Sequence, residues 1–293
     1  MMKRTTGERV FSICNVIVLA LLALACVVPV WHVLCASVSD PYEVAISRDF
    51  IFYPLKTFQT EAYKIILTYK GLWTGYLNTI FYVVCQCILA VVFSCIGGYI
   101  LSRKTLRYKG LFALIMLIPM MFNGGMVPTF LVMQKLKLLD TRLVMILPGA
   151  INIIYFIFMK IAIESVPDSL EESAYLDGAG AFRTMVQVIL PLCKATLAVI
   201  VLFTAIAKWN DYMSALIYLP TKTEYYPLQM YIRSILNNSQ NITNASQAID
   251  NANMYAQQVE YAVIIVTIAP ILCIYPFVQK YFVKGVTLGA VKG

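Results

Sequence analysis

Two charged side chains interrupt an apolar stretch in the second half of the chain. Lys208 and Asp211 lie within residues 195–219 and are three residues apart, so they share one face if the stretch is helical. An isolated charge inside a bilayer costs roughly 2.5–3.5 kcal/mol, so we expect these two to pair or to face an aqueous cavity. Such a face could hydrogen-bond a polar solute, or it could bond neighbouring helices.

Other side chains near apolar stretches could line a polar path for a solute. They are amides and tyrosines, the groups that bind hydroxyls: Asn123, Asn152, Tyr155, Asn210 and Tyr212. Proline and glycine residues surround Asn123, as is typical of discontinuous helices at transporter gates, although a kink against a neighbouring helix is the alternative. A site formed mainly by another subunit would leave none of these residues in contact with the solute.

Residues that could support catalysis or hold a metal are poorly placed. His32 is the only histidine, and the eight cysteines form no C-x-x-C pair. The cysteines lie within or beside apolar stretches, where cysteine serves as a small apolar residue. The sequence therefore predicts no catalytic residue, no metal site and no cofactor.

The composition is that of a membrane protein. Of 293 residues, 60% are hydrophobic and 13% are charged, and mean hydropathy is +0.75, whereas a soluble domain has about a quarter of its residues charged. The net charge of +8 would suit nucleic acid if the basic residues were clustered, but they flank apolar runs. We therefore expect a lipid bilayer, and no nucleic acid, as a partner.

Six apolar stretches are long enough to cross the bilayer, which takes about 20 helical residues. They are residues 13–37, 77–100, 111–133, 143–163, 195–219 and 261–283. Only helices satisfy their own backbone hydrogen bonds in lipid outside a closed barrel, so we expect an all-α integral membrane protein with a single transmembrane domain over residues 1–293. The first stretch is too long for a typical cleaved signal peptide, and it is read as a retained anchor.

Basic residues set the expected orientation. Arg103, Lys104, Arg107 and Lys109 fill one short loop without an acidic residue, and Lys3, Arg4 and Arg9 precede the first span. The positive-inside rule then places both termini, including the tail 284–293, in the cytoplasm. The external segment 38–76 is expected to hold short interfacial helices, and 220–260 is polar.

The cytoplasmic connection 164–194, between the fourth and fifth spans, is strongly patterned. Pro167 presets a helix start, and Ser169 with Glu172 forms an S-x-x-E capping box, with Asp168 and Glu171 as an alternative register. A short helix should follow, and glycines at 178 and 180 should turn the chain before a second helix climbs towards Pro191.

The short helix is expected to dock against another protein. Ala174, Gly178 and Ala179 leave a face with little side-chain bulk, which permits close approach of a partner. An amphipathic helix lying on lipid headgroups would carry a basic face. This segment begins instead with acidic residues, among them Glu171, Glu172 and Asp177, so a protein partner is favoured.

The same segment resembles the motif E-A-A-x3-G-x9-I-x-L-P of permease subunits of bacterial and archaeal ABC importers. The matching residues are Glu172, Ser173, Ala174, Gly178, Val188, Leu190 and Pro191, with Asp177 and Ala179 in a fuller version. Ser173, Met185 and Val188 depart mildly from the family pattern. Resemblance to the carbohydrate branch, and to its maltose G-like permeases, is carried by 123–130, 137–142, 209–212 and the tail 283–293.

The resemblance implies a type I importer permease in the bacterial cytoplasmic membrane. Its partners would be a second related permease, two cytoplasmic ABC ATPases and an extracytoplasmic sugar-binding protein. Glu172 to Pro191 would couple the spans to the ATPases, and the tail, with Gly289 and Lys292, would reach the interface between them. The chain lacks G-x-x-x-x-G-K-[ST], so ATP would be bound by the separate ATPases. The alternatives are an ion-coupled secondary carrier, with Lys208 and Asp211 as coupling residues, and a membrane scaffold.

Overall fold

The structure of this chain is a computed structural model that describes residues 6–122, 124–245, 257–274 and 276. Its regular elements are helices throughout the described residues, which confirms the predicted all-α class. The chain divides into two compact units, residues 1–70 with 232–270 and residues 71–231 with 271–293, and each is described by itself.

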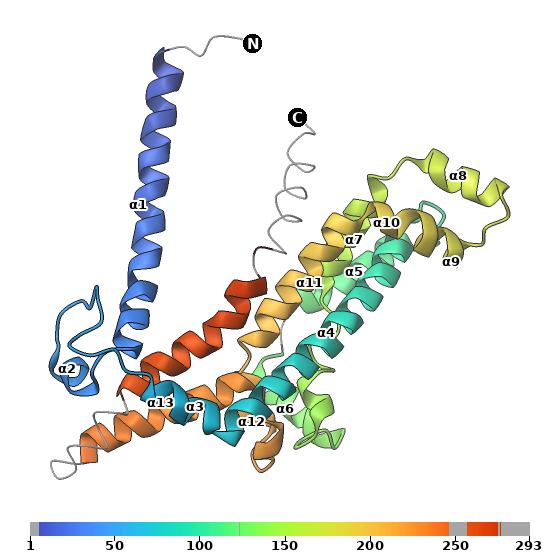
Figure 1. Cartoon of the computed structure of the whole chain (residues 1–293). Helices are drawn as coiled ribbons and strands as arrows, with labels where there is room; N and C mark the ends of the chain where they lie inside the picture. The colour runs from blue at the N-terminus through green and yellow to red at the C-terminus, as the bar shows by residue number, and fades with distance from the viewer. Residues whose placement is uncertain (1–5, 123, 246–256, 275, 277–293) are drawn as a thin grey trace. The chain divides into compact units, whose positions relative to one another are not determined.

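The first unit is formed by three helices and parts of two more. They are α1 Thr6–Ser37, α2 Pro41–Ile46, α3 Glu61–Thr68, the part of α13 Leu228–Ala245 that follows residue 231, and the start of Gln257–Ile274 (Figure 1). The end of α1 packs through Cys35 and Ala36 against Val44, and the Gln258 amide donates to the Ser39 carbonyl at 2.8 Å. The helices α2 and α3 confirm that short helices occur within 38–76. His32 Nδ1 accepts from the Ile51 N–H at 3.0 Å, a structural role.

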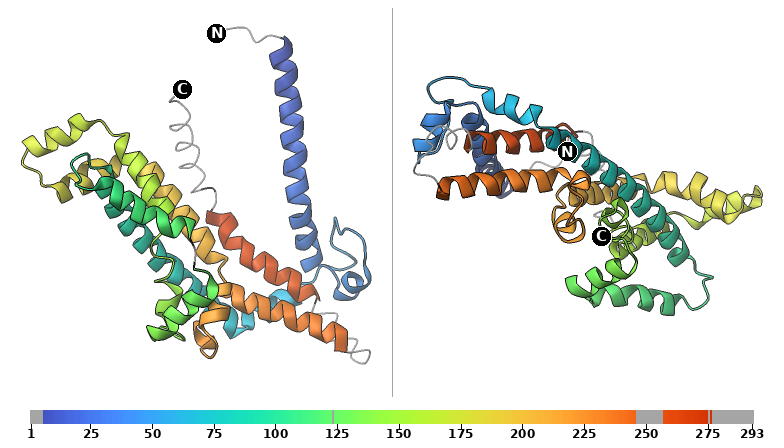
Figure 2. Two further views of the ribbon diagram at one scale, coloured as in Figure 1. Left: turned by 180° about the vertical axis from the view of Figure 1, so that it is seen from behind. Right: turned by 90° about the horizontal axis from the view of Figure 1, so that it is seen from below.

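The second unit holds most of the remaining elements. In chain order they are α4 Lys70–Ser102, α5 Lys109–Met121, α6 Met126–Lys135, η1 Arg142–Met145, α7 Ile153–Glu164, α8 Asp168–Leu176, α9 Ala181–Thr184, η2 Met185–Ile189, α10 Leu190–Leu192, α11 Lys194–Trp209, α12 Met213–Tyr218, η3 Thr223–Tyr225 and the start of α13 Leu228–Ala245. Helices α4, α7 and α11 run side by side (Figures 1 and 2). Their shared core includes Tyr99, Met159, Ile189 and Ile200.

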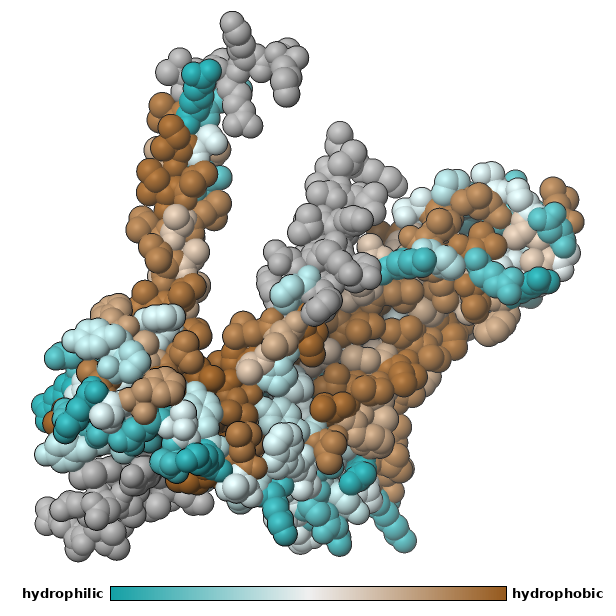
Figure 3. Space-filling model, viewed as in Figure 1, coloured by the Kyte–Doolittle hydropathy of each residue, from teal (hydrophilic) through white to brown (hydrophobic). Residues whose placement is uncertain are grey.

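Three described helices are long and apolar enough to cross a membrane: Gly7–Ser37, Lys70–Ser102 and Gln257–Ile274. Two bent pairs raise the number to five if each is one span. Apolar side chains cover α1 and the flank of α4 in the space-filling view, and hydrophilic residues gather around the α8 end (Figure 3). The first, second and sixth predicted spans therefore coincide with long apolar helices, the last as far as residue 274.

The third predicted span, 111–133, is broken. Helices α5 and α6 are bent by 110° relative to each other, and Gly125 precedes α6 with φ of 85°. Asn123 lies outside the described residues.

The fourth and fifth predicted spans also differ from single helices. Within 143–163 only α7 is α-helical, since Pro148 and Gly149 lie in a turn, and its 12 residues reach about 18 Å at 1.5 Å per residue. Within 195–219 the helix stops at Trp209 and resumes at Met213. Hydropathy averaged over these windows does not reveal such interruptions. The turn residues 146–150 are themselves largely apolar, and the polar residues 210–212 are outweighed by their apolar neighbours.

Candidate functional site

The helix α8 ends at a turn that requires glycine. Gly178 has φ of 80°, a left-handed conformation that other residues adopt at a cost. Its N–H donates to the Tyr175 carbonyl at 3.0 Å, and the Ala179 N–H donates to the Ala174 carbonyl at 2.9 Å. This pair of hydrogen bonds is a Schellman motif. The glycine of the E-A-A-x3-G pattern is therefore explained by backbone geometry at a helix end.

The start of α8 differs from the predicted capping box. The helix begins at Asp168 with Pro167 at the N-cap, which makes no side-chain capping hydrogen bond. Ser169 is therefore inside the first turn, where the Ser173 hydroxyl donates to its carbonyl at 2.8 Å. The alternative capping box of Asp168 with Glu171 is not formed either, because Asp168 is already the first helical residue. Acidic residues in the first turn still favour the helix, because they lie at the positive end of its dipole.

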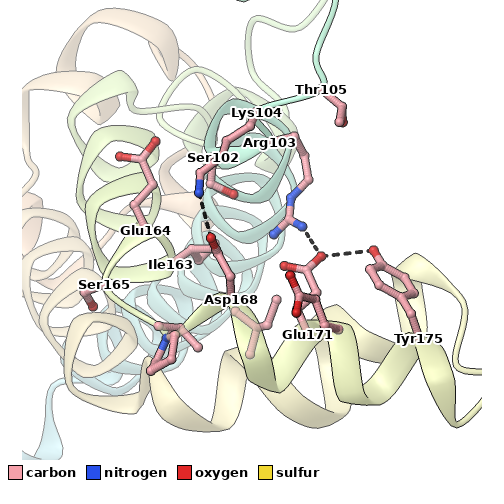
Figure 4. Close-up of a pocket in the computed structure, with 14 residues that line it drawn as sticks. Ser102, Arg103, Lys104, Thr105, Ile163, Glu164, Ser165, Asp168, Glu171 and Tyr175 are labelled. Atoms are coloured by element: carbon pink, nitrogen blue, oxygen red, sulfur yellow. Dashed lines mark hydrogen bonds and ion pairs between the residues drawn. The ribbon is translucent and has the colours of Figure 1, made fainter.

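Ion pairs connect α8 to the loop that follows α4. Arg103 pairs with Glu171, whose carboxylate also accepts from the Tyr175 hydroxyl at 3.0 Å, and Lys104 Nζ lies 2.6 Å from Asp168 Oδ2 (Figure 4). These residues line a cavity of about 660 Å³ between α8, the end of α4 and the end of α7. The acidic start of α8 is thus matched by the basic loop that the sequence placed on the cytoplasmic side.

Two residues near the end of α4 hold both sides of the glycine turn. The Arg103 guanidinium lies 4.0 Å from the centre of the Tyr99 ring, and the Tyr99 hydroxyl donates to the Ala181 carbonyl at 3.2 Å. Arg103 and Glu171 side chains are 24% and 16% exposed, so their interaction is only partly screened. α4 therefore contacts α8 through Arg103 and α9 through Tyr99.

The charges around α8 shift carboxyl pKa values downwards. The hydrogen bond and the positive charge of Lys104 lower the pKa of Asp168, and Asp168 raises the pKa of Lys104. Partial burial raises the pKa of Glu164, but hydrogen bonds and charges from Lys160 and Lys109 outweigh it, so the net direction is down. Of the four carboxylates that line the cavity, those of Glu164, Asp168 and Glu171 are each paired with a cation.

The α8 segment, which we define as residues 168–184, exposes large apolar side chains beside charged ones, and not only the small residues that were predicted. Ala174 is buried within the chain, so it does not offer the small-residue face predicted for it. Large side chains are exposed instead: Leu176 is 89% exposed and Phe182 is 74% exposed, one on each side of the turn. Glu172, Asp177 and Gly178 are exposed, Ala179 is half-buried, and Pro191 is exposed in α10.

A second polar site lies at the break between α11 and α12. Lys208, in the last turn of α11, lies 2.8 Å from Asp211, and their side chains are 8% and 19% exposed. Asp211 also accepts from the Ser214 N–H at 3.0 Å, which caps the start of α12. The predicted pairing is confirmed, but the two residues face each other across a helix end rather than along one continuous helix.

The remaining candidates for a polar path have local structural roles. Asn152 caps α7 by accepting from the Ile154 N–H at 3.0 Å, and Tyr155 is buried in the core between α4, α7 and α11. Asn210 ends α11 and donates to the Ile206 carbonyl at 2.8 Å. Tyr212 is half-buried at the N-cap of α12. Gly289 and Lys292 lie outside the described residues.

Several residues at these sites were missed from the sequence. Arg103 was counted only as a topology signal, and Leu176 and Phe182 were not singled out, although both stand beside the two turn glycines. Gln86, a buried amide on α4, had no signal beyond being a polar residue in the centre of a long span. No group of three or more potential metal ligands occurs among the described residues.

Comparisons with known proteins agree with this arrangement. Residues 65–288 match the family described as binding-protein-dependent transport system inner membrane component. The chain is 37% identical over 276 residues to a Bacillus subtilis polygalacturonan/rhamnogalacturonan transport system permease protein, YtcP, covering 94% of this chain and 96% of YtcP. It is 34% identical over 292 residues to protein LplC of the same species, covering 100% of this chain and 98% of LplC.

A solved structure is also similar. A chain of a bacterial ABC transporter involved in the import of the acidic polysaccharide alginate matches with a TM-score of 0.85 and 34% identity, over 96% of this chain and 100% of that one. The resemblance carried by the segment from Glu172 to Pro191 is thereby confirmed. This chain belongs to the family of binding-protein-dependent transport system inner membrane components, the permeases of ABC importers.

Proposed function

We propose that this chain is one of two permease subunits of an ATP-driven importer of oligosaccharides. The relatives named above support a carbohydrate cargo, since two of them serve polygalacturonan/rhamnogalacturonan and alginate. The chain crosses the cytoplasmic membrane six times with both termini inside, so that α8 lies in the cytoplasm. A second permease completes the path, and an extracytoplasmic sugar-binding protein delivers the cargo.

The α8 segment is the docking site for an ABC ATPase. The observation that carries this proposal is the pair of large apolar side chains, Leu176 and Phe182, exposed on either side of the Gly178 turn. Hydrophilic residues are intermingled with apolar ones at the α8 end (Figure 3), so an uninterrupted contact with lipid is not expected there. Acidic neighbours at 172 and 177 surround Leu176 and Phe182 and would disfavour adsorption to anionic lipid. Exposed apolar side chains flanked by acidic residues are suited to docking in a groove on a protein subunit.

Movement of the docked segment would reach the membrane helices by three routes. Ser165 to Pro167 joins α8 to α7, and residues 181–193 join it to α11. The third route is non-covalent, through Tyr99 and Arg103 at the end of α4. When two ATPases close on ATP, these connections would turn the spans from an inward-open to an outward-open arrangement. ATP is bound by those subunits, and no cofactor is assigned to this chain.

Two further assignments belong to this proposal. The tail, including Gly289 and Lys292, extends towards the ATPase interface, as the family resemblance implies. Lys208 and Asp211 contribute to the polar path within the membrane. An ion-coupled carrier that uses this pair is the rival function, and membership in a binding-protein-dependent family does not favour it.

Co-purification from membranes tests the docking site. The importer is expressed with its ATPase, and the double variant Leu176→Asp with Phe182→Asp is compared with the wild type. We expect the ATPase to be retained by the wild type and lost from the variant, because a groove lined for apolar side chains would have to bury two carboxylates. Tyr108→Asn is the matched control: Tyr108 is 63% exposed in the neighbouring loop, and its left-handed backbone suits Asn. An ATPase that stays bound to the double variant would contradict the proposal.

A further inference from the structure

A small cavity with both polar and apolar lining residues lies where the α11–α12 break meets the middle of α4. Its volume is about 250 Å³, and its wall includes Gln86 of α4, Met145 of η1, and Lys208, Asp211 and Ser214 from the two sides of the break. One water takes about 30 Å³ in the liquid, so the cavity has room for several waters or for a compact polar group. Gln86 is the central residue of α4, which extends from Lys70 to Ser102.

The Gln86 amide gives this cavity an unsatisfied hydrogen-bonding group. The residue is 8% exposed, and its Oε1 has no hydrogen-bond partner among the described residues. Its side chain occupies the space left by Gly149, where an added Cβ would lie 2.9 Å from Gln86 Cδ. Buried polar atoms are normally paired, and an unpaired one calls for an explanation. The last torsion of glutamine is soft, so a rotation of the amide presents its oxygen or its nitrogen to the cavity.

Lys208 and Asp211 determine which ligand suits the cavity. Within the part of the chain that the structure describes, Lys208 Nζ donates to Asp211 Oδ2 at 2.8 Å, and an ammonium group has three donors. The charges of this pair cancel, so a carboxylate ligand would meet Asp211 as closely as Lys208. A cation would in turn meet Lys208. Hydroxyl groups, which both donate and accept, match an amide oxygen beside an ammonium–carboxylate pair.

We propose that this cavity is a subsite for the ring hydroxyls of one sugar unit of the cargo, with Gln86 and Lys208 as its ligand-binding residues. The inference rests on the proposed oligosaccharide import and adds a substrate contact in this subunit. It predicts that the site recognises hydroxyls and is indifferent to whether the sugar carries a carboxylate. Any charge recognition would then occur elsewhere along the path.

The test uses the whole importer reconstituted in vesicles with its saturating, loaded binding protein. The cargo is taken from a panel of oligogalacturonates, alginate oligosaccharides and maltooligosaccharides, and sugar moved per ATP hydrolysed is measured. We expect Gln86→Leu and Gln86→Met, which conserve volume, to assemble with the ATPase and to lower this ratio about tenfold. Ser94→Ala, at a buried serine of α4 outside the cavity, is the control and should transport like the wild type.

Methyl-esterified oligogalacturonate separates hydroxyl from carboxylate recognition. If the Gln86 variants move less sugar per ATP by the same factor for the charged and the esterified oligomers, the subsite is supported. A decrease confined to the charged oligomer would overturn it. Wild-type ratios in both Gln86 variants would also overturn it, as would failure of both to assemble, because the amide would then serve only packing. A wild-type importer that moves no sugar of the panel would count against the proposed function as well.

Discussion

The α8 segment and the α11–α12 break both stop a helix, but by different physical means. At α8 the backbone conformation ends the helix, through the left-handed Gly178 and the two hydrogen bonds of the Schellman motif. The ion pairs around this helix include an exposed one, Lys104–Asp168. At the break a buried ion pair, Lys208–Asp211, replaces the missing backbone hydrogen bonds, with Asp211 capping the next helix. The first arrangement depends on backbone geometry and the second on a largely buried ion pair, so the two regions should respond very differently to substitution.

The largest effect is expected at the buried pair. Asp211→Leu leaves Lys208 buried without a partner, which costs about 3–5 kcal/mol, and the permease should fail to accumulate in membranes. Lys208→Met combined with Asp211→Leu removes both charges and should restore accumulation, measured by immunoblot of membrane fractions and by gel filtration. Normal accumulation of the single variant would show that the pair is hydrated, which contradicts the burial argument.

The next effect is expected at the glycine turn. Gly178→Ala places a Cβ in a left-handed conformation at a cost of roughly 1–2 kcal/mol, so α8 should lose its defined end without unfolding the permease. Protease sensitivity of the loop should increase, and ATPase retention should fall several-fold. Gly180→Ala is the control, because Gly180 has φ of −73° and open space around it. Similar behaviour of the two variants would refute the backbone explanation.

A smaller effect is expected for the half-buried pair between α4 and α8. Arg103→Ala or Glu171→Ala removes a charge-assisted hydrogen bond, worth about 1–3 kcal/mol. Each should lower the sugar moved per ATP while leaving ATPase binding measurable, because α8 would move without α4. The charge-swapped variant, Arg103→Glu with Glu171→Arg, should recover part of the loss. If the swap were as impaired as the single variants, direct pairing would be the wrong explanation.

The smallest effect is expected for the exposed pair Lys104–Asp168. Lys104→Gln and Asp168→Asn should leave assembly unchanged, because solvent screens exposed pairs. The pKa of Asp168 is lowered in the folded chain, so any contribution of the pair is present above the unfolded carboxyl pKa of about 4 and is lost as pH falls through the lower folded value. Melting temperatures of wild type and Asp168→Asn should therefore differ little and by a constant amount from pH 8 to pH 6. A difference that grows in this range would contradict the assignment.

The sequence predicted the class, the family and the short helix that ends at Gly178, because these depend on local chemistry. Apolar length predicts helices in lipid, and Gly178 predicts a turn whatever surrounds it. The interruptions of the fourth and fifth spans were not predicted, because they were averaged out over a long apolar window. The contact of Arg103 with Glu171 was not predictable, because it joins residues 68 positions apart. The predicted capping box did not form because Pro167 is the N-cap residue. Ser169 would have had to occupy that position, and it lies two residues further along, inside the first turn.

The docking of the α8 segment is tested most directly by cross-linking in the assembled importer. A benzoylphenylalanine is introduced at Leu176, at Phe182 or at the control position Tyr108, and membranes are irradiated. We predict a covalent product with the ATPase from positions 176 and 182 and none from position 108. Products with lipid alone from 176 and 182, or an ATPase product only from 108, would contradict the proposal that this segment joins the permease to its energy source.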